Sequence, residues 1–74
     1  MVNQIPIYLF PDTIIYLKNS KDLVHNIQND NNIKIKIINK KTNPYVLVSG
    51  KFENCHKTRI LLHEIEKNNY HIAN

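Results

Sequence analysis

Seventy-four residues, of which 42% are hydrophobic and 22% charged, carry a formal net charge of +4. A chain of this length forms one domain at most, which excludes multidomain enzymes and barrels. Its apolar share is too high for a disordered tail. We therefore expect one domain over residues 1–74, with a core from about residue 5 to residue 67 and a frayed tail over residues 70–74.

Cys55 is the only cysteine, so the sequence excludes an internal disulfide framework. One sulfur also leaves too few ligands for a zinc finger or knuckle. A chain without disulfides is typical of an intracellular, reducing compartment, either nuclear or cytoplasmic. The apolar start, residues 1–10, is short and contains Pro6, so we expect neither a signal peptide nor contact with a membrane.

The first periodic segment predicts a strand over residues 3–10, because Ile5, Ile7 and Leu9 alternate with other side chains. Pro6 favours an edge position for this strand, since proline has no N–H to donate to a neighbouring strand.

Two helices are predicted next. Pro11, followed by an acid, is typical of a helix start, so we expect a helix from residue 12 to about residue 18. Asn19 or Ser20 can cap a second helix. The apolar stripe of this second helix consists of Leu23, Val24 and Ile27. The asparagine-rich segment that follows predicts a turn.

The clearest pattern in the chain is the strict alternation of isoleucine and lysine over residues 33–37, which predicts a strand. A further strand is predicted over residues 45–49, and Gly50 ends it. Because the loop over residues 39–44 joins the two strands, we expect them to pair as a hairpin.

The last segment predicts a helix from Phe52 to about Asn69. Its core-facing stripe consists of Cys55, Leu61, Leu62 and Ile65. Glu64, Glu66 and Lys67 are expected to be solvated. The order strand, helix, helix, strand, strand, helix predicts an α+β fold, in which three helices pack on one face of a three-stranded sheet.

This order resembles the type I K-homology (KH) domain of proteins that bind single-stranded RNA or DNA. The resemblance covers residues 5–67 and rests on four local patterns at the offsets of that family. They are Leu23-Val24-x-x-Ile27, Asn32-Ile33-Lys34-Ile35-Lys36-Ile37, Val46-Leu47-Val48-Ser49-Gly50, and the set Cys55, Thr58, Leu61 and Leu62. The resemblance implies the β-α-α-β-β-α fold and a nucleic-acid groove between the first two helices and the second strand.

One part of the family pattern is missing. The loop between the first two helices carries a GxxG motif in KH domains, where the glycines let the backbone approach the phosphates closely. Here Lys18-Asn19-Ser20-Lys21 occupies that place without a glycine. The clamp role therefore does not transfer to this loop, and divergent KH domains of this kind also serve as protein-binding modules.

Two interpretations of the turn Lys18-Asn19-Ser20-Lys21 stay open. It is either a substitute anion site beside a helix N-terminus or a plain capped turn with solvated lysines. The resemblance also implies a second lysine wall on the second strand and the loop after it. This wall consists of Lys34, Lys36, Lys40 and Lys41. Lysines that alternate along a strand also protect a sheet edge from aggregation.

Apolar residues are expected to floor the groove between these walls, and the candidates are Leu17, Val24 and Ile35. An exposed sheet face with aromatic residues can stack bases, as in RRM domains, but the sequence lacks the motifs of that family. Tyr8, Phe10 and Tyr45 are therefore interpreted as core or rim packing. His56 and His63 lie two helical turns apart, too far to share one metal ion, and no acid is placed to orient a histidine. We expect no catalytic residue, no metal and no cofactor.

The leading hypothesis is binding of single-stranded nucleic acid, RNA in the first instance, by one module of a larger protein. The alternative is a KH fold without RNA binding that serves as a protein-interaction module or forms a homodimer. The missing glycines favour the alternative, and the lysines favour the leading hypothesis.

Overall fold

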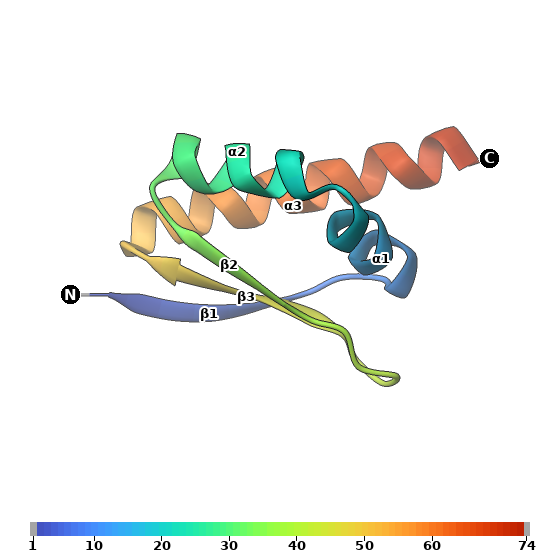
Figure 1. The fold of residues 1–74 in the computed structure, drawn as a ribbon, viewed down its shortest axis with the longest axis horizontal. Coiled ribbons are helices and arrows are strands. Elements are labelled where there is room, and N and C mark those ends of the chain that lie inside the picture. Colours follow the sequence, from blue (N-terminus) through green and yellow to red (C-terminus); the bar gives the residue numbers. More distant parts are fainter. Residues whose placement is uncertain (1, 74) are drawn as a thin grey trace.

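The computed structural model describes the backbone of residues 2–73 and the side chains of residues 2–68. Its elements follow the order β-α-α-β-β-α that the sequence predicts. They are β1 (Asn3–Tyr8), α1 (Pro11–Asn19), α2 (Lys21–Asn31), β2 (Lys34–Ile38), β3 (Tyr45–Gly50) and α3 (Phe52–Ala73). Figure 1 shows the helices as one layer over the sheet, whose opposite face they leave uncovered. The α+β prediction is thus confirmed.

The sheet has the strand order β1-β3-β2, and both pairs of strands are antiparallel. The predicted hairpin of β2 and β3 is confirmed, with Lys36 opposite Leu47. β1 lies on the other side of β3, with Tyr8 opposite Tyr45. β1 is therefore an edge strand, as Pro6 indicates, and β3 is the central strand.

Alternation along the strands gives the sheet two different faces, because successive side chains point to opposite sides. One face carries buried Ile7, Val46 and Val48 and packs against the helices. We call the other one the open face. Its residues are Gln4, Pro6 and Tyr8 of β1, Tyr45, Leu47 and Ser49 of β3, and Lys34, Lys36 and Ile38 of β2.

The core lies between the helices and the sheet. Ile14 and Leu17 of α1, Ile27 of α2 and Leu62 of α3 are almost completely buried there. Full burial of each such side chain stabilises the fold by about 1.5–3 kcal/mol. Cys55 is also fully buried, as the helical stripe predicts.

Two predictions about the burial of α3 side chains are wrong. Leu61, expected in the core-facing stripe, is 37% exposed, because the face that packs on the core follows Cys55, Thr58 and Leu62 and leaves Leu61 beside it. Glu66, expected in solvent, is only 9% exposed. Its Oε2 accepts a hydrogen bond from the backbone N–H of Phe10, the residue that caps α1. The helical row that buries Leu62 brings Glu66 to the same face one turn later, next to the start of α1. The carboxylate is buried because it has this backbone donor as a partner.

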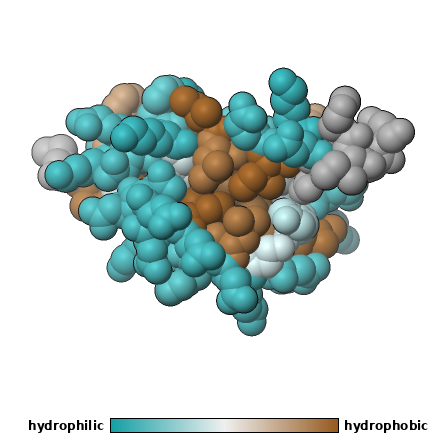
Figure 2. Space-filling model, turned by 90° about the horizontal axis from the view of Figure 1, so that it is seen from above, coloured by the Kyte–Doolittle hydropathy of each residue, from teal (hydrophilic) through white to brown (hydrophobic). Residues whose placement is uncertain are grey.

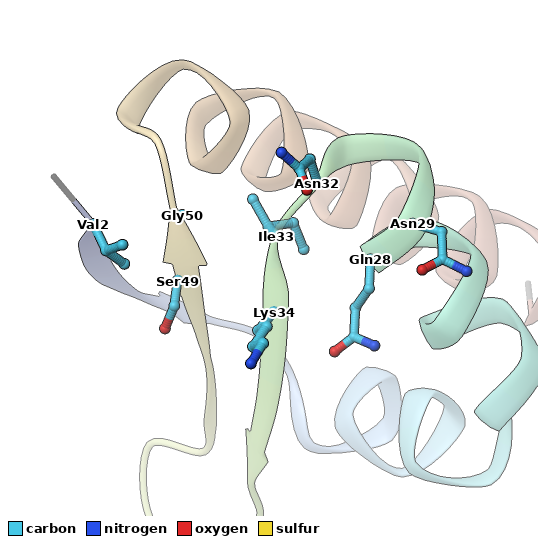
Figure 3. A pocket seen from close by; sticks show the side chains of 8 residues that line it. All are labelled: Val2, Gln28, Asn29, Asn32, Ile33, Lys34, Ser49 and Gly50. Atoms are coloured by element: carbon cyan, nitrogen blue, oxygen red, sulfur yellow. The ribbon is translucent and has the colours of Figure 1, made fainter.

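α2 ends in a left-handed residue, Asn32, whose φ is 51°. The next N–H, that of Ile33, donates to the carbonyl of Gln28, which closes the helix end. The turn predicted for the asparagine-rich segment is therefore confined to Asn32, because Asn29, Asp30 and Asn31 belong to α2. Where the chain enters β2, Ile33 lies beside Gly50 of β3 (Figure 3). A Cβ on Gly50 would lie 2.6 Å from Cγ2 of Ile33, so this position needs glycine for close packing.

The backbone of α3 is helical through Ala73, whereas the sequence pattern predicts an end near Asn69. The expected frayed tail therefore coincides with the last turn of this helix, apart from Asn74, which lies outside the described residues.

Candidate nucleic-acid interface

The charges of the chain are distributed unevenly between the two layers. All six acidic residues lie in helices, where basic residues nearly balance them. α1 has one acid and one lysine, α2 has two acids and one lysine, and α3 has three acids and three basic residues. Lys51, between β3 and α3, offsets the extra acid of α2. The four remaining lysines therefore account for the whole net charge of +4.

These four lysines belong to β2 and to the loop that joins β2 to β3. They are Lys34, Lys36, Lys40 and Lys41, and all of them are exposed. Lys34 and Lys36 lie on the open face, because their neighbours Ile35 and Ile37 pack against the core. A surface with this much positive charge and no acid of its own attracts polyanions.

Two aromatic rings lie side by side on the same open face. The ring centroids of Tyr8 and Tyr45 are 5.4 Å apart and the ring planes are tilted by 49°. The Nζ atom of Lys40 lies 5.2 Å from the centroid of the Tyr45 ring, a cation–π geometry. Tyr45 is half-buried, whereas Tyr8 is 59% exposed. Of the interpretation as core or rim packing, the core part is wrong for Tyr8 and Phe10, which are both exposed.

The predicted turn lies in the other layer. Lys18, Asn19 and Lys21 are exposed, and Ser20 is half-buried at the junction of α1 and α2. Ser20 is the N-cap of α2, but its side chain makes no capping hydrogen bond. Because Lys34 and Lys36 lie on the open face of the sheet, the structure does not bring the two groups of lysines to one surface.

The three residues expected to floor a groove are placed differently from one another. Leu17 is 1% exposed and belongs to the core, so it offers no surface to a ligand. Val24 and Ile35 are half-buried and also pack against the core. Beside them the Gln28 side chain crosses from α2 to β2, where its Oε1 accepts a hydrogen bond of 2.8 Å from the N–H of Ile35. This bond closes part of the space between α2 and β2.

Hollows border the open face. One of about 400 Å³ lies beside Leu47 and the β2 edge. It is lined by Gln4, Gln28, Lys34, Ile35, Lys36, Leu47 and Ser49. Another of about 500 Å³ lies between the start of α1 and the β2–β3 loop, and its lining includes Tyr8, Phe10 and Lys41. Lys34 and Lys36 line the first of these hollows, and Lys41 lines the second.

A third hollow, of about 530 Å³, lies at the end of the sheet where β2 begins (Figure 3). Asn32, Ile33 and Gly50 form part of its wall. Asn29 of α2 belongs to the lining as well. Lys34 is the only charged residue among those that line it, so this hollow has little to hold a charged ligand.

Among the side chains of residues 2–68, the remaining reactive groups form no site. Burial raises the pKa of the Cys55 thiol, so the side chain stays protonated and behaves as a small apolar residue. His56 lies on the exposed side of α3, stacked on Phe52 and within 3.0 Å of Arg59. Within the described residues no group of histidine, cysteine and acidic side chains is arranged to hold a metal ion.

Sequence reasoning finds the lysines of the open face but misses its aromatic pair. The missing step is strand register, since Tyr8 and Tyr45 become neighbours only when β1 and β3 pair antiparallel with these residues opposite. The sequence does contain one signal. In each strand the tyrosine alternates with core-facing residues, which places both tyrosines on the solvent-facing side of the sheet. Gln28 is also missed, because nothing in its helical pattern shows that β2 begins beside it.

Within residues 2–73, no helix is long and apolar enough to cross a membrane. Comparison of the chain with protein-family models, with curated proteins and with solved structures gives no match.

Proposed function

We propose that the chain is a divergent type I KH domain that binds single-stranded nucleic acid, RNA in the first instance, and that β2 and the β2–β3 loop contact the phosphates. The observation that carries the proposal is the location of the net charge. The four lysines that no acid balances, Lys34, Lys36, Lys40 and Lys41, lie on β2 or on this loop, and the exposed ring of Tyr8 lies on the same sheet.

The element order and the single helical layer support the KH part of this proposal. The turn between α1 and α2 lacks both glycines, so its backbone is poorly suited to approach a phosphate. A positive surface elsewhere on the domain compensates for the lost clamp. On this account the phosphate contacts lie on the sheet layer.

Lysine suits such a surface because its ammonium group is a flexible point charge that follows a backbone without demanding one geometry. Each phosphate that a lysine neutralises releases counterions, which gives a slope of about −0.7 in log K against log salt concentration for single strands. If all four lysines contribute, the slope is about −3. Affinity then falls about fifty-fold between roughly 50 mM and 200 mM salt.

The proposal is tested by titrating a labelled single-stranded RNA of about ten nucleotides into the protein at these two salt concentrations. The variant Lys34→Gln/Lys36→Gln should bind more weakly and lower the slope by about 1.4, since two phosphate contacts are lost. Its matched control is Lys57→Gln/Lys67→Gln, which removes the same charge from exposed positions of α3. The control should change affinity much less.

A third variant, Lys18→Gln/Lys21→Gln, tests the turn between α1 and α2. If this pair lowers affinity more than the β2 pair does, the phosphates lie at the helical turn and the assignment to the sheet is wrong. Absence of binding by the unmodified protein at the lower salt concentration would overturn the proposed function altogether.

The alternative, a protein-interaction or dimerisation module, is favoured by one specific observation. Figure 2 shows apolar side chains gathered over the helical layer, on the side away from the sheet. Exposed apolar residues of α1 and α3 include Ile15, Ile60 and Leu61. Concentration-dependent association in sedimentation experiments, together with no RNA binding, would favour this alternative. A monomer over the same concentration range would count against the homodimer.

A further inference from the structure

We propose that the open face of the sheet is a stacking platform for unpaired bases and that Tyr8 is the ring on which a base lies. This inference rests on the proposed function, because it assigns base contacts to residues that adjoin the phosphate-contacting lysines. It concerns the face of the sheet opposite the helices, where Tyr8 and Tyr45 lie opposite each other on paired strands.

The two rings of the aromatic pair differ in their surroundings, because Tyr45 already contacts a lysine and Tyr8 is open to solvent. Lys40 lies over the Tyr45 ring, and Tyr45 is half-buried between its neighbours on the central strand. Tyr8 is on the edge strand and more than half exposed. Contact with Tyr45 restricts the Tyr8 ring while it leaves that ring accessible to solvent. An exposed ring that is held in place loses little conformational entropy when a base stacks on it.

The neighbouring positions extend the platform with apolar surface. Pro6 and Leu47 lie opposite each other on the open face, two residues along the strands from the tyrosine pair. Two residues correspond to about 7 Å along a strand. Lys36 lies opposite Leu47 on the other side, so this second row ends in a lysine at the β2 edge, whereas the tyrosine row ends in Ile38.

These rows give the platform a direction across the sheet. The two lysines of the open face lie on β2, whereas its tyrosines, Pro6 and Leu47 lie on β1 and β3. A nucleic-acid strand that follows β2 places its phosphates near Lys34 and Lys36 and turns its bases over Leu47 and the tyrosines. Charge and stacking thus act on opposite sides of the same nucleotides.

Stacking also sets the class of ligand. In a duplex each base already stacks on its neighbours, so no base face is free to lie on Tyr8. The platform therefore prefers single strands. Because every base has a π face, it tolerates different sequences, and its preferences follow stacking strength.

The experiment uses two oligonucleotides of equal length and charge, a single-stranded RNA and a strand of the same length without bases. At fixed salt, the strand with bases should bind about tenfold more tightly or better, since stacking contributes to affinity base by base. Equal affinity for the two strands would overturn the platform. It would leave the phosphate contacts of the proposed function in place, because the abasic strand still binds through charge.

Variants of Tyr8 locate the stacking. Tyr8→Ala should lose about tenfold in affinity for the RNA and almost nothing for the abasic strand. Tyr8→Phe should keep the affinity, because the ring and not the hydroxyl makes the contact. The matched control is Tyr16→Ala, which removes a ring that is 42% exposed on α1 in the other layer. If Tyr16→Ala costs as much as Tyr8→Ala, the assignment of Tyr8 is wrong.

If Tyr8→Ala lowers the stability of the fold, its affinity alone does not locate the stacking. A fluorescent residue at position 8 reports contact with a base directly. The chain contains no tryptophan, so Tyr8→Trp introduces a single one at the platform. The RNA should quench or shift its fluorescence at saturation, and the abasic strand should leave it nearly unchanged. An identical response to both strands would overturn the proposal. Failure of both strands to bind the unmodified protein would instead remove the proposed function.

Discussion

The backbone N–H of Phe10 donates a hydrogen bond of 2.6 Å to the carboxylate of Glu66, a residue 56 positions further along the chain. This bond ties the start of α1 to the last helix. Replacing Glu66 with alanine should lower the free energy of unfolding by about 1.5–3 kcal/mol, because a hydrogen bond to a charged group is lost. Chemical denaturation of the variant measures this loss.

The control for Glu66 is its neighbour Glu64, which is exposed. Glu64→Ala should change the free energy of unfolding by no more than about 0.5 kcal/mol. Glu66→Gln, which keeps an acceptor oxygen but loses the charge, should fall between the two. Equal stability of Glu66→Ala and Glu64→Ala would show that the bond to Phe10 does not stabilise the fold.

Replacement of either of two buried threonines with valine should change the stability of the protein, in opposite directions. Thr13 is 1% exposed, and its hydroxyl finds no hydrogen-bond partner among residues 2–68. The hydroxyl of Thr58, by contrast, donates to the carbonyl of Asn54 at 2.8 Å. Thr13→Val should therefore stabilise the protein by about 1 kcal/mol, since it replaces an unpaired buried hydroxyl with a methyl group of similar shape. Thr58→Val should destabilise it by about 0.5–1.5 kcal/mol. Thermal unfolding with the same sign for both variants would contradict the account.

Gly50 is required by close packing at the end of the sheet. Gly50→Ala should destabilise the protein by about 1–3 kcal/mol, because its new Cβ would overlap the Ile33 side chain. Ser49→Ala, on the open face next to it, should have an effect within about 0.5 kcal/mol. Denaturation midpoints of the two variants give the comparison, and similar midpoints would mean that Ile33 moves aside at little cost.

Cys55 should be unreactive while the protein is folded. Burial removes its side chain from solvent and raises the pKa of the thiol, so both access and thiolate are reduced near neutral pH. Alkylation of the native protein should proceed only as fast as the chain opens, and much faster in denaturant. Rapid alkylation under native conditions, at the rate of a free thiol, would contradict the burial of this residue in the core.

The local patterns predict most of the fold because each of them depends on neighbouring residues. The alternation of isoleucine and lysine in β2 and the burial of Cys55 and Leu62 in α3 both correspond to the structure. The asparagine-rich segment ends α2, although only Asn32 lies outside the helix. The end of α3 is less predictable, since several polar residues near Asn69 are compatible with either helix or coil.

The surface is less predictable because it depends on pairs of residues from distant segments. No local pattern shows that Tyr8 faces Tyr45, that Glu66 reaches Phe10, or that Gln28 bonds to Ile35. The alternation of β2 does show that Lys34 and Lys36 share one face. That face points away from the helices, because the isoleucines that alternate with these lysines pack against the core.

Under the proposed function, single-stranded nucleic acid lies across the open face of the sheet. The most direct measurement is a titration of isotope-labelled protein with a short single-stranded RNA, followed by the shifts of its backbone amide resonances. We expect the largest shifts on β2, on the β2–β3 loop and at Tyr8 and Tyr45, with small shifts on α2 and α3. Shifts concentrated around Lys18–Val24, or the absence of shifts at low salt, would contradict the account.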